Sequence, residues 1–120
     1  MTAQPLLTMY HIPGCPFSER VEILLALKGL EAIMADVEID ISRPRPDWLL
    51  KKTQGTTALP AMELDNGETL KESMGSMRYL EDRFPERPVA QRDPYRHAGE
   101  SMLCATDGAF TGAGYRMILN

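Results

Sequence analysis

The sequence Pro13-Gly14-Cys15-Pro16-Phe17-Ser18-Glu19-Arg20 (PGCPFSER, residues 13–20) decides the fold, because it joins a strand to a helix through a thiol. The apolar run at residues 6–12 precedes it and predicts a buried strand that ends at the Pro-Gly pair. After it, apolar side chains recur at helical spacing up to Gly29, a typical C-terminal stop. They are Phe17, Val21, Leu24, Leu25 and Leu27. This part of the chain therefore predicts a strand, a tight turn and a helix that begins directly after Cys15.

The following residues predict a second strand, a short helix, a hairpin and a final helix. Residues 33–41 alternate apolar and acidic side chains from Val37 onward, which is typical of a strand. Residues 48–52 predict a short helix, and residues 56–64 and 69–70 predict a hairpin around an Asp-Asn-Gly turn. The next predicted element is a helix that ends at Pro85. Its apolar face consists of Met74, Met77, Leu80 and Phe84. The order β-α-β followed by β-β-α is the thioredoxin-like α/β arrangement.

The domain organisation follows from the residue at which the elements of the thioredoxin-like order are complete. Residues 1–86 form the predicted thioredoxin-like domain, and residues 87–94 have the proline-rich, charged composition of a linker. Residues 95–120 start with a helical pattern but are too few to bury a core of their own. We expect them to be the beginning of an all-helical C-terminal domain. The chain is then either a fragment of a longer protein or a piece that associates with copies of itself.

Composition and charge exclude several classes of function. The net charge of −4 and the pI near 5.1 offer no basic surface to nucleic acid or anionic lipid. No apolar run approaches the ~20 residues that span a bilayer, and the N-terminus lacks the pattern of a signal peptide. The two cysteines have neither a disulfide framework nor metal-ligand spacing. A reducing, cytoplasmic location is expected, without metal, nucleic acid or stable membrane insertion.

Cys15 is the candidate catalytic residue, because the first turn of a helix stabilises a thiolate. Unpaired backbone N–H groups and the positive end of the helix dipole favour the anion, which is the reactive form of cysteine. Pro16 fits the first helical position, and Arg20 lies one turn further with a positive charge. Three residues after Cys15 stands Ser18, so this C-x-x-S site has no second thiol with which to resolve a mixed disulfide. A small thiol cosubstrate would have to do so. The alternative is a cysteine that only packs under a helix start.

Two further signals lie downstream, and each also has a purely structural interpretation. Pro60 after Leu59 could be an ordinary edge-strand proline. In a thioredoxin-like fold it would be a cis-proline facing the thiol, which leaves the Leu59 backbone able to pair with an extended peptide. Ser73 could be a helix N-cap with Glu72 as a solvated charge. Together they could instead hold the carboxylate and the ammonium group of an α-amino acid.

The segments CPFSERVEILLALKG, RPDWLLKK, TTALP and LKESMGSMRYLEDRFP resemble, in this order, the N-terminal domain of cytosolic glutathione transferases. The cysteine-bearing omega class and its bacterial relatives are the most similar, and the resemblance covers roughly residues 5–86. It implies glutathione as cosubstrate, a helical C-terminal domain that supplies the pocket for the second substrate, and a homodimer. The second substrate would be a small electrophile or a disulfide.

The resemblance also implies a role for each candidate site residue. Cys15 would form a mixed disulfide with glutathione, with Phe17 and Pro60 beside the tripeptide. Leu59 would pair with its cysteinyl backbone, and Glu72 and Ser73 would hold its γ-glutamyl end. Arg45 falls where omega-like members place a lysine near the glycyl carboxylate, although one additional residue separates it from Pro60; otherwise it is a solvated charge. Other charged and aromatic residues are expected to be structural or exposed: Tyr10, His11, Trp48, Lys51, Lys52 and His97.

The expected function is glutathione-dependent thiol transfer: reduction of disulfides, of dehydroascorbate-like oxidants or of S-glutathionyl adducts. Three alternatives remain open at this point. One is a non-enzymatic relative of the intracellular chloride channel type, which shares a CPF motif but for which the charged residues 17–30 make a poor spanning segment. Another is a glutathione-binding module without turnover. The third is a stand-alone monothiol glutaredoxin, which the linker and the tail do not fit.

Overall fold

The computed structural model describes residues 5–119 of the chain, in two compact units that divide between Arg87 and Pro88. The first unit has three helices, one 3-10 turn and four strands; the second contains one long helix. In chain order the elements are β1 (Leu7–His11), α1 (Pro16–Lys28), the 3-10 turn η1 (Glu31–Ile33), β2 (Met34–Glu38), α2 (Asp47–Lys52), β3 (Ala61–Glu63), β4 (Thr69–Leu70), α3 (Ser73–Arg83) and α4 (Pro94–Leu119).

The four strands form one mixed sheet in the order β2-β1-β3-β4. β1 pairs in parallel with β2, from Leu7 opposite Met34 to His11 opposite Glu38. β3 is antiparallel to β1, and β4 is antiparallel to β3. The parallel pair is joined through α1, whereas the antiparallel pair is a hairpin, so the predicted β-α-β and β-β-α order is present.

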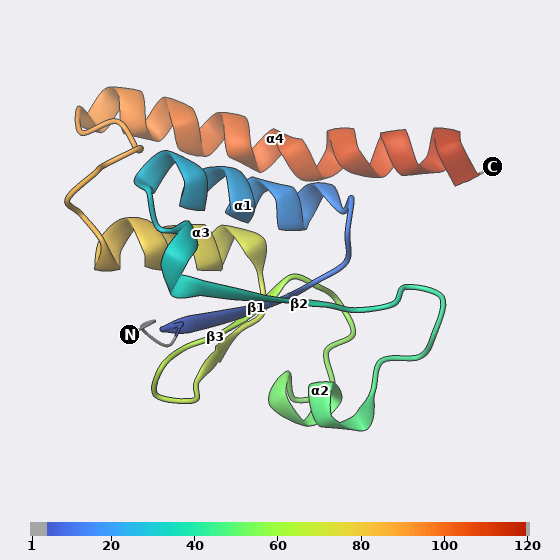
Figure 1. The fold of residues 1–120 in the computed structure, drawn as a ribbon. Helices are drawn as coiled ribbons and strands as arrows, with labels where there is room; N and C mark the ends of the chain where they lie inside the picture. The colour runs from blue at the N-terminus through green and yellow to red at the C-terminus, as the bar shows by residue number, and fades with distance from the viewer. Residues whose placement is uncertain (1–4, 120) are drawn as a thin grey trace. The chain divides into compact units, whose positions relative to one another are not determined.

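Helices cover both faces of this sheet, and each face has its own apolar cluster (Figure 1). α1 and α3 lie on one face, and the core there combines Leu7, Met9, Val21, Leu24, Leu25, Met34, Met62, Leu64 and Leu80. α2 lies on the other face, over a smaller cluster of Tyr10, Ile39, Leu49, Leu59 and Ala61. Alternate strand residues therefore enter the two clusters, as the pleat of a strand requires.

Helix α1 begins and ends where the sequence predicts. Cys15 is its N-cap and Pro16 its first residue, while Gly29 ends it in the left-handed conformation with φ of 70°. There the N–H of Gly29 donates to the Ala26 carbonyl and that of Leu30 to the Leu25 carbonyl. The prediction that Leu27 belongs to the apolar face of α1 is wrong, because Leu27 is 56% exposed. Lys28 takes its place among the buried residues of the helix.

Strand β2 lies earlier in the chain than the alternation of residues 37–41 predicts. It ends at Glu38, because the backbone turns at Asp40, whose carboxylate accepts hydrogen bonds from both the N–H and the hydroxyl of Ser42. Ile41, which the alternation assigns to the buried face, is 70% exposed. A local side chain-to-backbone turn thus overrides the periodic pattern.

The hairpin and the helix after it also differ from the prediction in detail. β3 starts at Ala61, so residues 56–60 are loop and not strand. The turn itself is as expected, with Gly67 at φ of 88° and the Leu64 N–H donating to the Glu68 carbonyl. In α3 the buried residues are Ser73, Ser76 and Leu80, whereas Met74 is 40% exposed and does not belong to the apolar face.

The second unit is dominated by α4, a single helix of 26 residues. Asp93 caps it, since its carboxylate accepts the Arg96 N–H and its carbonyl accepts the His97 N–H. The helical pattern expected around residues 97–104 continues through three glycines to Leu119. Among the described residues, none of the helices combines the length and apolar character that crossing a membrane requires. The boundary at residue 86, the linker and the truncated helical domain stay predictions.

Candidate active site

Cys15 lies where a strand turns into a helix. Its backbone is extended, with φ of −75° and ψ of 124°, and its carbonyl accepts the first bond of α1 from the Glu19 N–H. Its own N–H donates to the Ile12 carbonyl across the turn, which Gly14 makes at φ of 75°. The residue is half-buried, so the thiol lies at the surface of the first turn of α1. The predicted strand, turn and helix start are confirmed.

Ser18 stands three residues further, at the position that a resolving thiol would occupy. It is 1% exposed, and within residues 5–119 its hydroxyl has no hydrogen-bond partner. Both cysteines of the chain are free, with Cys104 exposed on α4. Cys15 therefore has no partner thiol in its own helix turn.

Phe17 and Arg20 lie together on the first turns of α1. The guanidinium carbon of Arg20 is 5.1 Å from the centroid of the Phe17 ring, a cation–π contact. Phe17 is half-buried. The positive charge expected near Cys15 is thus present on the same helix, held against an aromatic ring.

The Leu59–Pro60 peptide bond is cis, as the thioredoxin-like order predicts. The Leu59 side chain is buried in the α2-side cluster, against which Ile12 also packs. Because Ile12 accepts the N–H of Cys15, Leu59 is tied through this cluster to the turn that presents the thiol. Within residues 5–119 no hydrogen bond engages the backbone groups of Leu59.

Glu72 and Ser73 form the start of α3. Glu72 is the N-cap, exposed, with a carbonyl that accepts the Ser76 N–H. Ser73 is the first helical residue and is buried, so the alternative in which Ser73 is the cap is wrong. α1 and α3 pack against each other and start at the same end of the first unit (Figure 1). Two helix N-termini, with Cys15 and with Glu72 and Ser73, therefore face the same end.

Arg45 precedes α2 and is half-buried. Its Nε donates to the Thr57 carbonyl at 3.0 Å, which links the loop before α2 to the loop before Leu59. Lys51 is exposed, as expected. Arg45 thus lies beside the cis-proline loop in contact with its backbone.

A polar network on the α2 side was missed by the sequence analysis. The Tyr10 hydroxyl donates to Glu63 Oε1 at 2.7 Å, and Lys52 Nζ donates to Glu63 Oε2 at 3.0 Å. The Tyr10 ring also packs against Trp48, with centroids 5.5 Å apart. The hydrogen bonds from Tyr10 and Lys52 lower the pKa of Glu63. Tyr10 is therefore core, as predicted, while Lys52 is a structural partner that joins α2 to the sheet.

Tyr10 is expected to ionise well above the ordinary pKa of 10.0 in an absorbance titration of the folded protein. Burial first, and then the hydrogen bond and negative charge of Glu63, raise its pKa to about 12. Because this folded value lies above the ordinary 10.0, the contribution of Tyr10 to stability is complete below pH 10 and is lost as pH rises toward 12. Glu63→Gln should move the late phase to lower pH. A folded protein that shows no tyrosine ionisation phase near pH 12 would contradict this.

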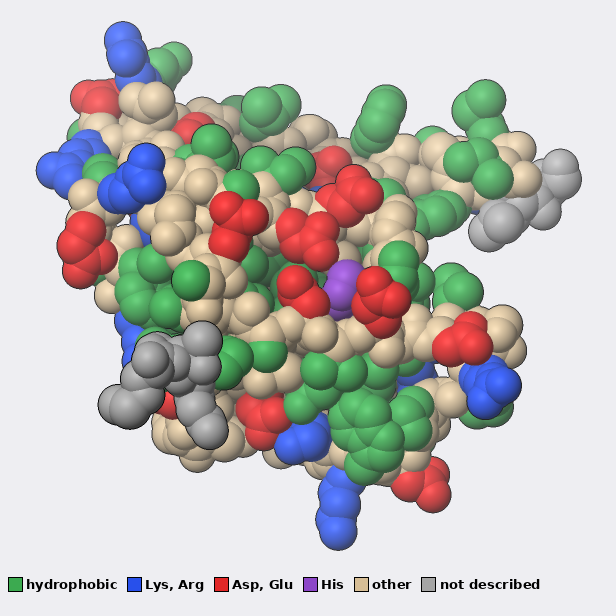
Figure 2. Space-filling model, viewed as in Figure 1, with side chains coloured by type: hydrophobic (Ala, Val, Ile, Leu, Met, Phe, Trp, Pro, Cys, Tyr) green, Lys and Arg blue, Asp and Glu red, His purple; other side chains and the backbone are tan. Residues whose placement is uncertain are grey.

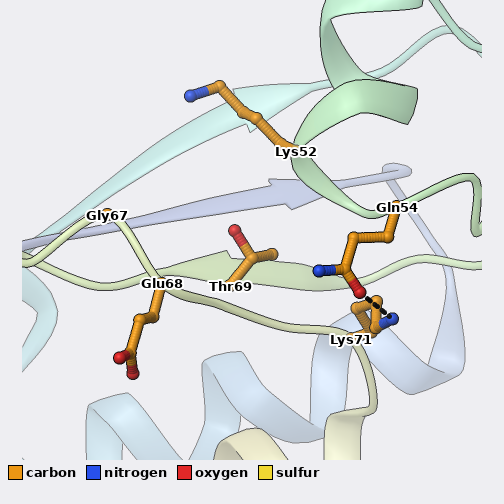
Figure 3. Close-up of a pocket in the computed structure, with 6 residues that line it drawn as sticks. All are labelled: Lys52, Gln54, Gly67, Glu68, Thr69 and Lys71. Carbon is orange, nitrogen blue, oxygen red and sulfur yellow. Dashed lines mark hydrogen bonds between the residues drawn. The ribbon is translucent and has the colours of Figure 1, made fainter.

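A polar pocket of about 340 Å³ lies near this network (Figure 3). Its lining residues are Lys52, Gln54, Gly67, Glu68, Thr69 and Lys71. Lys71 donates to the Gln54 side chain, and Lys52 to Glu63, so both ammonium groups have partners. None of the candidate site residues lines this pocket, although Lys71 directly precedes Glu72.

Comparison with known families gives one match over most of the first unit. Residues 9–88 match the family described as glutathione S-transferase, N-terminal domain. Pyrimidodiazepine synthase of Drosophila melanogaster is 30% identical over 115 residues, which are 92% of this chain and 45% of that protein. Glutathione S-transferase L1 of Arabidopsis thaliana is 35% identical over 103 residues, which are 85% of this chain and 43% of that protein. The chain thus spans less than half the length of these relatives.

Solved structures agree with the fold. Glutathione transferase Omega 3C from Trametes versicolor has a TM-score of 0.69 at 26% identity, over 84% of this chain and 44% of that chain. Rice GST1, solved in complex with glutathione, has a TM-score of 0.62 at 29% identity, over 72% of this chain and 37% of that chain. The predicted thioredoxin-like α/β fold with a helical C-terminal part is confirmed, and so is the resemblance to cytosolic glutathione transferases.

Proposed function

The chain belongs to the glutathione S-transferase family, and on that premise we propose that it is the glutathione-binding part of an enzyme that transfers thiols through Cys15. The observation that carries this proposal is the half-buried Cys15 at the N-cap of α1, where its side chain makes no capping hydrogen bond. The glutathione complex of rice GST1 supports the choice of ligand. Conjugation of glutathione to aromatic electrophiles is less favoured. That reaction needs the enzyme only to keep the glutathione sulfur ionised, whereas a cysteine tends to form a disulfide with that sulfur.

The reaction uses one enzyme thiol, the glutathionyl group of the adduct and one molecule of reduced glutathione. The Cys15 thiolate attacks the glutathionyl sulfur of an S-glutathionyl adduct; the adduct's disulfide breaks, and the leaving thiolate takes a proton from solvent. This leaves a mixed disulfide between Cys15 and glutathione. A second glutathione thiolate attacks the glutathionyl sulfur, which releases oxidised glutathione and restores the Cys15 thiolate. The external thiol is required because Ser18 stands where an internal resolving cysteine would be.

Four elements converge on the tripeptide in this proposal. The unengaged backbone of Leu59, preceding cis-Pro60, pairs with the cysteinyl residue as an added strand does. The Glu72 carboxylate takes the α-ammonium group, and Ser73 with the start of α3 takes the α-carboxylate. Phe17 lies beside the sulfur of the bound glutathione. Arg45, already against the Thr57 carbonyl, lies at the glycyl end.

The homodimer and the cytoplasmic location belong to this proposal as well. The acidic composition and two free cysteines are compatible with a reducing compartment. Light scattering of the purified protein, with its intact mass, measures the oligomeric state directly.

Glu72→Gln and Ser73→Ala are expected to weaken glutathione binding by about 10-fold or more each, since each removes a hydrogen bond to a charged group. The KM for glutathione should rise while kcat changes little, because neither residue touches the glutathione sulfur. Glu68→Gln is the matched control: it removes an exposed carboxylate from the turn between β3 and β4. Equal affinity of Glu72→Gln and Glu68→Gln would contradict the assignment.

A further inference from the structure

A group of three ligand-type side chains lies apart from the residues assigned to glutathione. One ligand atom each of His11, Glu22 and Asp36 lies within 4.8 Å of the others. His11 ends β1, Asp36 is in β2, and Glu22 projects from α1. The space-filling view shows acidic side chains gathered around a histidine on the face in view (Figure 2).

The sheet register explains why these residues meet. In β1, Leu7 and Met9 point into the core under α1, and His11 follows them on the same face. In β2, Met34 enters this core, and Asp36 is the next residue on its face. β2 is the edge strand, so Asp36 opens to solvent while α1 carries Glu22 over the same corner. The cluster is thus reachable from water on one side.

His11 is the feature that sets this cluster apart from an ordinary acidic surface. The residue is only 7% exposed, yet within residues 5–119 its Nε2 has no hydrogen-bond partner. Its Nδ1 lies 3.6 Å from Glu22 Oε1, too long for a hydrogen bond. A buried imidazole ordinarily has a hydrogen-bond partner. Among the described residues, the His11 imidazole makes no hydrogen bond, and it lies beside the carboxylates of Glu22 and Asp36.

We propose that His11, Glu22 and Asp36 bind a divalent transition-metal ion such as Zn²⁺. One imidazole nitrogen and two carboxylate oxygens form a mixed set of ligands that suits such ions, with the remaining position filled by water. Zn²⁺ holds these atoms at about 2.0–2.2 Å, which brings them roughly 3–4 Å from one another. Bringing the ligand atoms to this spacing needs small rotations of the Glu22 and Asp36 side chains. Glu22 is half-buried and Asp36 is exposed. The bound ion joins β2 to β1 and α1, and Cys15 lies between the last two in the chain.

The test is isothermal titration of the protein with Zn²⁺ in a Cys15→Ser/Cys104→Ser background, which removes both thiols as competing ligands. We expect saturable binding of one equivalent and a rise in Tm on addition of Zn²⁺, because the site exists only in the folded state. Glu22→Gln with Asp36→Asn should weaken the affinity by at least about 10-fold, since it replaces two of the three ligands. His11→Gln should do the same.

Glu38→Gln is the matched control. Glu38 is an exposed carboxylate on the same strand and face as Asp36, directly opposite His11 in the register, but it does not belong to the cluster. Its replacement should leave the affinity for Zn²⁺ within about 2-fold. The proposal is overturned if Zn²⁺ does not saturate, if the Glu22 and Asp36 variant binds like its parent, or if Glu38→Gln loses as much affinity. Circular dichroism of each variant separates lost ligands from lost fold.

Discussion

Replacing Cys15 by serine is expected to reduce glutathione-dependent thiol transfer by at least about 100-fold, because a serine hydroxyl neither ionises near neutral pH nor forms a disulfide. The fold should survive the change. Cys15 is the N-cap of α1, and serine is among the preferred N-cap residues. The loss of turnover would therefore report on chemistry and not on unfolding, which far-ultraviolet circular dichroism checks.

Cys104→Ser is the matched control for this experiment, because it removes the other thiol of the chain from an exposed position on α4. Its turnover should stay close to that of the unmodified protein. Full activity in Cys15→Ser, or equal losses in the two variants, would favour a glutathione-binding module in which Cys15 only packs.

Lys28→Met is expected to lower the free energy of unfolding of the first unit by about 1–3 kcal/mol, because it removes the buried ammonium group from the Arg87 carbonyl and from the half-buried Glu81. The Lys28 side chain is 1% exposed; its Nζ donates to the Arg87 carbonyl at 3.0 Å and lies 3.5 Å from Glu81. Methionine keeps most of the volume but removes the cation beside Glu81 and the donor to Arg87. Denaturant unfolding of the two proteins measures the difference.

An exposed ion pair supplies the control for Lys28. Arg78 and Asp82 pair at 2.9 Å on α3 with more than half of each side chain exposed, so Arg78→Met should cost at most about 0.5 kcal/mol. In Lys28→Met/Glu81→Leu, part of the loss should return, because the double change also removes the half-buried carboxylate of Glu81. A Lys28→Met protein as stable as Arg78→Met would show that the contacts of the buried Lys28 ammonium group do not stabilise the first unit.

The elements around Cys15 could be predicted because their signals are local. A proline at the first helical position, apolar side chains at helical spacing and a C-cap glycine at position 29 specify α1, Pro16–Lys28. The cis-proline and the start of α3 followed from the order of the motifs. In contrast, β2 was placed too late, because the Asp40 side chain turns the backbone where the apolar alternation still continues.

Contacts between distant residues could not be predicted in the same way. Lys28 looks like a surface charge in the sequence, and only the packing of α1 against α3 and the course of the chain to Arg87 bury it. Glu63 sits in a strand of three residues, where no pattern indicates that its carboxylate meets Tyr10. The cluster of His11 and Asp36 depends on the register between β1 and β2, which a single sequence does not specify.

The central claim is that Cys15 is the thiol that bonds to glutathione, and mass spectrometry of the protein after incubation with oxidised glutathione tests it most directly. We predict one glutathionyl group per chain, found on the peptide that contains Cys15, removed by an excess of reduced glutathione and absent from Cys15→Ser. Modification of Cys104 alone, or no adduct on either cysteine, would contradict the account.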